Sequence, residues 1–236
     1  MTVPAIIFDL DGTLIDTAPD LIDTLNFVFA RHRLRPMAYD AARAMIGGGA
    51  KRMIERGLNA EGIECPPADF DRLYAAFVDY YAAHIADRSR PFPGLETALD
   101  TLAARGFRLA VCTNKLEWLS VRLLDRLGLA SRFSAICGQD TFGMQKPNPE
   151  ILRRTVARVG GTMQRAVMVG DSAIDIHTAR AADVPVVAVD FGYSEIPIVQ
   201  LGADRIIGHF DDLAAAVLAL LPAARSNGAS APATWS

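Results

Sequence analysis

The sequence contains little cysteine. Only three cysteines occur among 236 residues, and these are Cys65, Cys112 and Cys137. None belongs to a CxxC or CxH cluster, and an odd number at wide spacing argues against a disulfide framework or a zinc site. We therefore expect three reduced thiols in the core or in loops, as is usual for a cytoplasmic protein.

The sequence also lacks a long apolar run and an excess of basic charge. No apolar stretch reaches the roughly 18 residues that a membrane-spanning helix needs. The first residues, MTVPAIIFDL, contain no basic segment typical of a signal peptide. The net charge is −3 at pH 7, whereas nucleic-acid-binding domains usually carry a basic stripe. We expect a cytoplasmic protein that binds neither a membrane nor a nucleic acid.

The sequence does contain several short apolar segments, each of which stops at polar or turn residues. They occupy residues 4–10, 107–112, 134–137, 166–169 and 185–189. Each is typical of a buried strand. Segments with helical spacing lie between them, at 94–104, at 116–127 and after Asn148, which suits a helix N-cap before Pro149. This alternation predicts an α/β fold with a doubly wound parallel sheet covered on both faces.

Residues 17–90 interrupt the alternation. They contain helical patterns and no convincing strand, and the patterns lie at 21–29, 39–45, 51–58 and 70–84. We expect a small all-helical cap domain inserted after the first strand. Residues 1–16 and 91–222 would form the core. Residues 223–236 are small and polar and contain proline and glycine, which predicts a disordered tail.

Polar motifs follow the predicted strands at four points. The motifs are Asp9-Leu10-Asp11-Gly12-Thr13, Thr113-Asn114, Lys146-Pro147 and Gly170-Asp171-Ser172-Ala173-Ile174-Asp175. Open parallel sheets bind ligands beyond the carboxyl ends of their strands. We therefore expect all four motifs to meet at one edge of the sheet.

Carboxylates from two of these motifs predict a cation site. Asp9, Asp171 and Asp175 would bring several negative charges together, and Mg²⁺ prefers such oxygen ligands. Lys146 and the hydroxyl of Thr113 add positive charge and a hydrogen-bond donor. Together these groups suit a phosphoryl group, whose charged oxygens need neutralising during transfer.

The two carboxylates of the first motif suggest a division of roles. Residues two apart in a strand point to the same face, but a turn at Gly12 allows Asp11 to point away from Asp9. One carboxylate can then attack phosphorus and form an aspartyl phosphate. The other can protonate the leaving group and afterwards activate water.

Taken in order over residues 6–176, the four motifs resemble those of the haloacid dehalogenase superfamily of phosphohydrolases. The resemblance implies that Asp9 is the nucleophile and Asp11 the general acid/base, whose main-chain carbonyl also binds Mg²⁺. The implied metal ligands are Asp9, Asp11, Asp171 and Asp175. The implied phosphate-binding residues are Thr113, Asn114 and Lys146, and Asn114 would order its loop or contact the phosphate.

The cap segment 46–58, IGGGAKRMIERGL, resembles the corresponding segment of phosphoglycolate phosphatases. Glycines before a helix expose backbone N–H groups and the positive end of the helix dipole to an anion. The candidate specificity residues are Gly48, Gly49, Lys51, Arg52 and Arg56. We hypothesise that they bind the carboxylate of 2-phosphoglycolate while the core holds its phosphate.

Other functions stay open at this point. A sugar-phosphate phosphatase is the strongest rival, and a phosphomutase or pyrophosphatase would use the same core. A dehalogenase of this superfamily lacks the second carboxylate, so Asp11 argues against it. A phospho-receiver needs no cap, and an inactive binding module has no need of every motif residue. In each enzymatic case the substrate is a small anionic phosphorylated metabolite, and the protein is a monomer or a homodimer.

Overall fold

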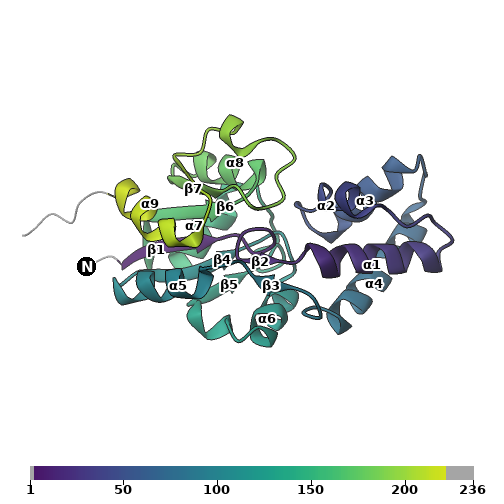
Figure 1. Cartoon of the computed structure of the whole chain (residues 1–236), viewed down its shortest axis with the longest axis horizontal. Helices are drawn as coiled ribbons and strands as arrows, with labels where there is room; N and C mark the ends of the chain where they lie inside the picture. The colour runs from purple at the N-terminus through teal and green to yellow at the C-terminus, as the bar shows by residue number, and fades with distance from the viewer. Residues whose placement is uncertain (1–2, 222–236) are drawn as a thin grey trace, which may run out of the picture.

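A parallel sheet forms the centre of the core (Figure 1). The computed structural model describes residues 3–221, and within them six strands pair in parallel in the order β5-β4-β1-β6-β7-β8. The strands are β1 (Val3–Phe8), β4 (Arg108–Cys112), β5 (Ala135–Cys137), β6 (Gly161–Gly170), β7 (Val186–Val189) and β8 (Arg205–Ile207). The chain extends the sheet from β1 first to one side and then to the other. This confirms the predicted doubly wound α/β fold.

Helices cover both faces of this sheet. The core helices are α5 (Leu95–Ala104), α6 (Glu117–Arg126), α7 (Pro149–Arg158), α8 (Ala173–Ala181) and α9 (Leu213–Leu220). Short 3₁₀ turns are η1 (Ala130–Arg132), η2 (Ile198–Gln200) and η3 (Phe210–Asp212). Successive residues of a strand face opposite sides. Ala5 and Ile7 of β1 therefore pack towards α7 and α8, whereas Ile6 and Phe8 pack in the cluster that includes α5, α6 and α9.

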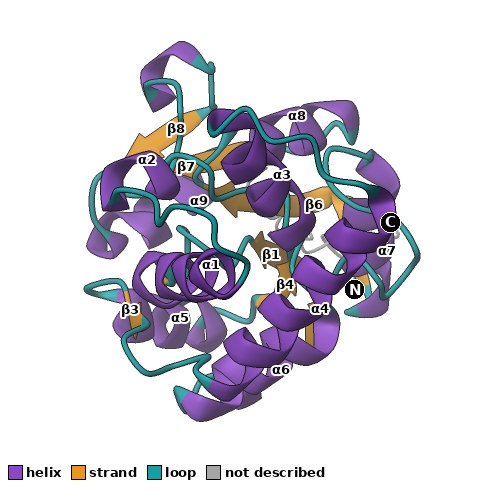
Figure 2. Ribbon diagram, turned by 90° about the vertical axis from the view of Figure 1, so that its right-hand side faces the viewer, coloured by secondary structure: helices purple, strands orange, loops and turns teal. Residues whose placement is uncertain are grey.

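The cap helices lie beyond the carboxyl ends of the strands (Figures 1 and 2). They are α1 (Ala18–Arg31), α2 (Tyr39–Arg43), α3 (Ala50–Ala60) and α4 (Pro67–Ala83). The chain enters and leaves them through β2 (Ile15–Asp16) and β3 (Arg90–Pro91), which pair with each other antiparallel. The two connections to the core therefore run side by side. The boundaries of a separate cap domain, 17–90, stay a prediction.

Several elements differ from their predicted bounds. β1 ends at Phe8, so Asp9 is the first residue after the strand, although its N–H still donates to Val169 O at 2.9 Å. β6 begins at Gly161, well before the predicted residue 166. The prediction missed the first half of this strand because that half is more polar and does not form an apolar run. The strands β2, β3 and β8 are too short to produce a periodic signal. The tail, 223–236, lies outside the described residues.

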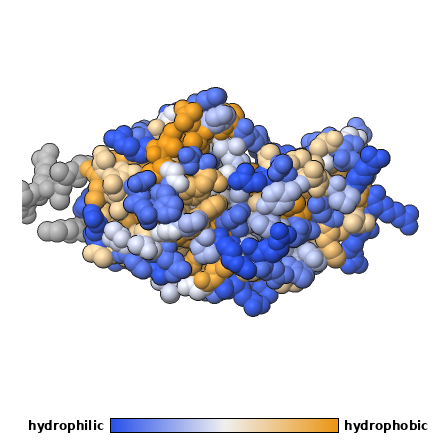
Figure 3. Space-filling view, in the orientation of Figure 1, coloured by the Kyte–Doolittle hydropathy of each residue, from blue (hydrophilic) through white to orange (hydrophobic). Residues whose placement is uncertain are grey.

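The face of the molecule drawn in Figure 3 carries both hydrophilic and hydrophobic residues. On the face shown in Figure 3, hydrophilic residues lie over both the core and the cap. Among residues 3–221, no helix has both the length and the apolar character that crossing a bilayer requires.

Candidate active site

The ends of β1 and β6 bring three carboxylates together. β1 and β6 are neighbours, with Phe8 in register with Val169, so Asp9 and Asp171 follow adjacent strands. Asp175 lies in the first turn of α8, which begins just after Asp171. One oxygen from each of the three carboxylates lies within 4.8 Å of the others. The structure thus brings together the three side chains predicted to surround a cation.

Lys146 lies among these carboxylates. Its Nζ is 2.9 Å from Asp9 Oδ1 and 2.5 Å from Asp175 Oδ1, and the side chain is almost fully buried. Burial opposes the charged ammonium, but Asp175 and Asp9 outweigh it, so the pKa of Lys146 is raised. Lys146 is therefore a fixed cation at the end of β1.

One lysine does not offset the charge of this cluster. Burial raises the pKa of Asp9 to about 6, with Lys146 opposing the shift and Asp175 adding to it. Burial, followed by the charges of Asp175 and Asp9, raises the pKa of Asp171 to about 8. Such shifts mean that the folded protein disfavours ionising all these groups at once. A divalent cation that prefers oxygen ligands fits these three carboxylates, because its charge would offset the repulsion among them.

Asp171 is held by both of its oxygens. Thr13 Oγ1 donates to Asp171 Oδ1 at 2.7 Å, and the backbone N–H of Tyr193 donates to Oδ2 at 2.8 Å. Asp175 is held as well, because its Oδ2 accepts from the backbone and hydroxyl of Ser172 in a capping box at the start of α8. These contacts fix the directions in which the two carboxylates point.

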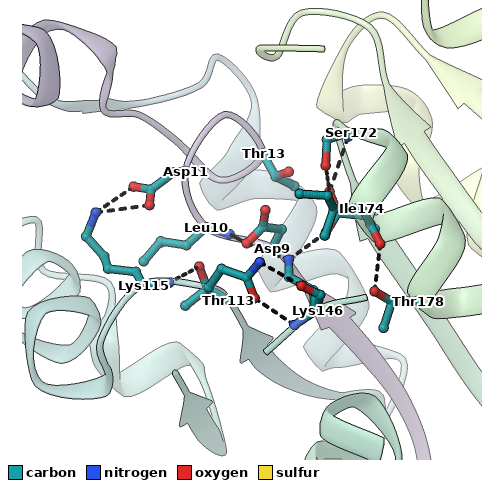
Figure 4. A network of polar contacts seen from close by, with 12 residues as sticks. Asp9, Leu10, Asp11, Thr13, Thr113, Lys115, Lys146, Ser172, Ile174 and Thr178 are labelled. Atoms are coloured by element: carbon teal, nitrogen blue, oxygen red, sulfur yellow. Dashed lines mark hydrogen bonds and ion pairs between the residues drawn. The ribbon is translucent and has the colours of Figure 1, made fainter. Parts of the chain in front are cut away.

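Asp11 points away from Asp9, as the turn at Gly12 predicts (Figure 4). Gly12 has φ +85°, and a Cβ there would lie 2.5 Å from Asp171 Oδ2. The Asp11 carboxylate accepts from Thr17 Oγ1 at 2.8 Å and from Lys115 Nζ at 2.9 and 3.0 Å. The two carboxylates of the first motif therefore occupy different environments.

Lys115 is a residue of the site that sequence reasoning missed. It is buried, it pairs with Asp11, and its ammonium lies 4.5 Å from the centroid of the Tyr81 ring in the cap. A lysine considered alone is usually solvent-exposed. The available signal was its position in Thr113-Asn114-Lys115, directly after β4.

Asn114 and Thr113 lie at the end of β4, next to Lys146. Asn114 Oδ1 accepts from the backbone N–H of Lys146 at 2.7 Å, and its Nδ2 donates to Lys146 O at 3.1 Å. Thr113 is buried, and its backbone N–H donates to Cys137 O at 3.0 Å. Asn114 thus links two of the four motifs by ordering the loop that carries Lys146.

A pocket lies between these groups and the cap. Its volume is about 60 Å³. Core residues that line it include Asp9, Asp11, Thr113, Asn114, Lys115 and Lys146. Cap residues that line it include Leu21, Ile46, Met53, Phe77, Tyr81 and the segment 47–50. Among the described lining residues, positive charge comes only from Lys115 and Lys146.

The predicted specificity residues divide into two groups. Gly48 and Gly49 line the pocket, in front of α3. Lys51, Arg52 and Arg56 do not line it. The Lys51 ammonium lies 5.0 Å from the centroid of the Tyr74 ring, and Arg52 is exposed. Arg56 forms an ion pair with Glu195 of the core.

The sequence pattern of the family described as haloacid dehalogenase-like hydrolase matches residues 6–189. This match includes the end of β1, the cap helices and all four motifs. The chain belongs to the haloacid dehalogenase-like hydrolases. The predicted family is confirmed.

Proteins similar to this chain support its place in the haloacid dehalogenase-like hydrolases. A phosphoglycolate phosphatase of Agrobacterium fabrum is 46% identical over 228 residues, which cover 97% of this chain and 97% of the relative. A phosphoglycolate phosphatase of Caulobacter vibrioides is 46% identical, covering 92% of this chain and 91% of the relative. The crystal structure of a predicted phosphoglycolate phosphatase from Haemophilus somnus 129PT is 30% identical, with a TM-score of 0.85 over 91% of this chain and 98% of that one. The chain is thus similar to these proteins over nearly its full length.

Proposed function

We propose that this protein is a Mg²⁺-dependent phosphomonoester hydrolase that acts through an aspartyl phosphate on Asp9, with 2-phosphoglycolate as its substrate. The observation that carries the proposal is the placement of Asp9 beside Lys146 and two further carboxylates, with Asp11 lining the same pocket but paired with Lys115. A nucleophile, a fixed cation and a separate proton donor are what phosphoryl transfer to water requires.

Asp9 is held in position to attack. Its Oδ1 accepts from the backbone N–H of Leu10 at 2.7 Å and lies 2.9 Å from Lys146 Nζ. Oδ2 is then the oxygen that bonds to phosphorus as the bond from phosphorus to the ester oxygen breaks. Lys146 and the Thr113 hydroxyl neutralise charge on the phosphoryl oxygens. Asp9, Asp171 and Asp175, with the Asp11 carbonyl, would hold Mg²⁺, which supplies further neutralisation of those oxygens.

Asp11 completes the cycle. With a proton on its carboxyl group, Asp11 donates that proton to the departing alkoxide, so that the ester oxygen leaves as the hydroxyl group of glycolate. It then accepts a proton from water as that water attacks the phosphorus of the aspartyl phosphate. The bond from phosphorus to Asp9 breaks, and inorganic phosphate leaves. Asp11 ends protonated and Asp9 ends as a carboxylate, so that the sum is ester plus water giving alcohol plus phosphate.

The proposed substrate rests on the groups that line the pocket. Among the described lining residues the positive side chains are Lys115 and Lys146 of the core, which leaves backbone donors of the cap for a second anionic group. Gly47, Gly48 and Gly49 have φ of 108°, 85° and 89° and precede α3, whose backbone N–H groups and dipole favour an anion. We propose that these N–H groups bind the carboxylate. The names of the relatives at 46% identity support the same substrate.

A panel of phosphate esters tests this proposal. Phosphate release would be measured for 2-phosphoglycolate, glucose 6-phosphate, pyrophosphate and p-nitrophenyl phosphate, with Mg²⁺ and with EDTA. We expect the highest kcat/KM for 2-phosphoglycolate, no activity in EDTA, and a loss of at least roughly 10³-fold in Asp9→Asn. A low rank for 2-phosphoglycolate would reject the substrate. Full activity of Asp9→Asn would reject the nucleophile.

We also propose a cytoplasmic location. Cys65, Cys112 and Cys137 are all free, and Cys112 and Cys137 are buried. Burial raises the pKa of Cys112 to about 12, which keeps it as an unreactive thiol. Free thiols are typical of proteins in reducing compartments. Fractionation of cells with a tagged copy would test the location.

A further inference from the structure

The loop after β7 connects the cap with the carboxylate cluster. This segment, residues 191–195 (Phe-Gly-Tyr-Ser-Glu), is called the FGYSE loop below and belongs to the core. Two arginines of the cap bind it. Arg43, at the end of α2, donates from Nη2 to Gly192 O at 2.8 Å, and its guanidinium lies 4.9 Å from the centroid of the Tyr193 ring. Arg56 of α3 forms an ion pair with Glu195.

The same loop also holds Asp171. The backbone N–H of Tyr193 donates to Asp171 Oδ2 at 2.8 Å. Gly192 packs directly on that carboxylate, because a Cβ there would lie 2.2 Å from Asp171 Cβ and 2.5 Å from Oδ2. Displacement of the FGYSE loop would therefore remove one of the two hydrogen bonds that orient the Asp171 carboxylate, the other being donated by Thr13. Asp175, in contrast, is oriented by Ser172 at the start of its own helix.

A third contact ties the loop to the connection between core and cap. The Tyr193 side chain is buried, its hydroxyl donates to Asp16 Oδ1 at 2.5 Å, and it accepts from the N–H of Ala18 at 2.9 Å. Asp16 ends β2 and Ala18 begins α1. Tyr193 therefore touches both the point where the chain leaves the core and the carboxylate at the end of β6.

We propose that Arg43 and Arg56 are positioning residues that couple closure of the cap to the orientation of Asp171, with the FGYSE loop as the connecting element. The proposal rests on the cation site proposed above. When the cap is closed, Arg43 holds Gly192 O, and the Tyr193 N–H stays on Asp171. Removal of a group that orients a metal ligand through a hydrogen bond commonly lowers the affinity for the metal. Because such coupling is reciprocal, a cation at Asp171 also favours the closed cap.

Calorimetric titration with MgCl₂ in the absence of substrate tests the coupling. The proteins compared are the wild type, Arg43→Ala, Arg56→Gln and Asp171→Asn. Arg35→Ala is the matched control, because Arg35 is an exposed arginine of the same cap. We expect the Kd for Mg²⁺ to rise about three- to tenfold in Arg43→Ala and about twofold in Arg56→Gln. It should stay within experimental error in Arg35→Ala.

Small-angle X-ray scattering in saturating Mg²⁺ gives a second readout. We expect a larger radius of gyration for Arg43→Ala than for the wild type, because the cap is no longer held on the loop. An unchanged Kd for Mg²⁺ in Arg43→Ala would overturn the coupling, whatever the radius of gyration. A raised Kd with an unchanged radius of gyration would overturn it as well, because the cap would then have no part in the effect. If Arg43→Ala does not fold, Arg56→Gln decides, and a wild-type Kd in that variant overturns the proposal.

The two proposals fail in distinguishable ways. If the wild type does not bind Mg²⁺, or if Asp171→Asn binds it equally well, the proposed cation site fails and the coupling fails with it. If the wild type binds Mg²⁺ through Asp171 and Arg43→Ala binds it equally well, only the coupling fails.

Discussion

The core and the cap contribute different chemistry to one pocket. The core supplies the charged side chains, Asp9, Asp11, Lys115 and Lys146, beside a few apolar ones such as Leu116 and Leu119. The cap wall is built from apolar and aromatic side chains and from the glycines of 47–49, and no charged side chain of the described cap residues lines the pocket. In the proposed function the core carries out the reaction, and the cap contributes backbone donors that select the substrate.

The two walls are also positioned differently. The core groups follow strands of one sheet, so hydrogen bonds such as that from Asp9 N to Val169 O fix them. The cap wall reaches the core through two short connections, β2 and β3, and through side-chain contacts such as Arg43 to Gly192 O. Groups on a sheet edge are held rigidly, which suits bond making, and we propose that the helical insert moves to close around a substrate.

The largest expected effect comes from a core carboxylate. Asp11→Asn should lower kcat for 2-phosphoglycolate by about 10²- to 10⁴-fold, because the leaving alkoxide loses its proton donor. For p-nitrophenyl phosphate the loss should be smaller, since its leaving group needs less protonation. Steady-state phosphate release measures both. Asp71→Asn, an exposed carboxylate of α4, is the control. More than a tenth of wild-type kcat in Asp11→Asn would remove Asp11 from the mechanism.

A change in the cap wall should affect one substrate more than another. A Cβ at Gly49 would lie 2.8 Å from Asn114 O, and φ there is +89°, so Gly49→Ala separates cap from core. We expect KM for 2-phosphoglycolate to rise roughly tenfold, equivalent to about 1.4 kcal/mol. The kcat/KM for p-nitrophenyl phosphate should fall less than threefold.

Gly62→Ala is the matched control for this change. Gly62 lies in the cap with φ +67°, and a Cβ there meets nothing within 4 Å. The Gly62→Ala substitution therefore imposes similar backbone strain, but the added Cβ makes no contact with the core. Equal changes in KM for the two glycine variants would show that strain, and not the pocket wall, causes the effect.

The carboxylate cluster predicts an unusual pH dependence of stability without metal. The folded-state pKa values of Asp9 and Asp171 are raised to about 6 and about 8 from 3.8. Above the unfolded pKa of 3.8 and up to about pH 8, the folded protein binds more protons than the unfolded chain. Its free energy of unfolding therefore falls as pH rises through this range. In EDTA we expect Tm to drop by at least about 3 °C between pH 5.5 and 8.

Two additions sharpen this measurement. Mg²⁺ should remove most of the drop, because it offsets the repulsion among the ionised carboxylates. In EDTA the Tm of Asp171→Asn should change less with pH than the Tm of the wild type, and at pH 8 it should be higher. A Tm of the wild type in EDTA that stays constant or rises over this range would contradict the charge balance described for the cluster.

The smallest effects are expected for the exposed cations of α3. Lys51 and Arg52 are exposed and do not line the pocket, although Lys51 contacts Tyr74, which does. A cation–π contact at an exposed site contributes about 0.5–1 kcal/mol. Lys51→Ala and Arg52→Ala should therefore keep KM for 2-phosphoglycolate within about threefold of the wild type. A tenfold rise would instead favour recognition of the carboxylate by cap side chains, as the sequence predicts.

Much of the core could be predicted because its signals are local. Five of the strands appear in the sequence as apolar runs, and the residues after them face one edge in any parallel sheet. Lys115 could not be assigned in this way, because its partner Asp11 is 104 positions away. The same is true of the cap. Its helices are visible as periodic patterns, but the contacts of Arg56 depend on how the cap is placed against the core.

The sequence by itself determined the α/β fold, the helical insert and the family, since strand ends, periodicity and four ordered motifs are properties of short segments. Only the tertiary structure decided which charges meet. It brings Lys115 to Asp11, Arg56 to Glu195, and Tyr193 N–H to Asp171. The physical reason is that an ion pair or an orienting hydrogen bond depends on separations of a few ångströms, which chain spacing does not specify across a sheet and an inserted cap.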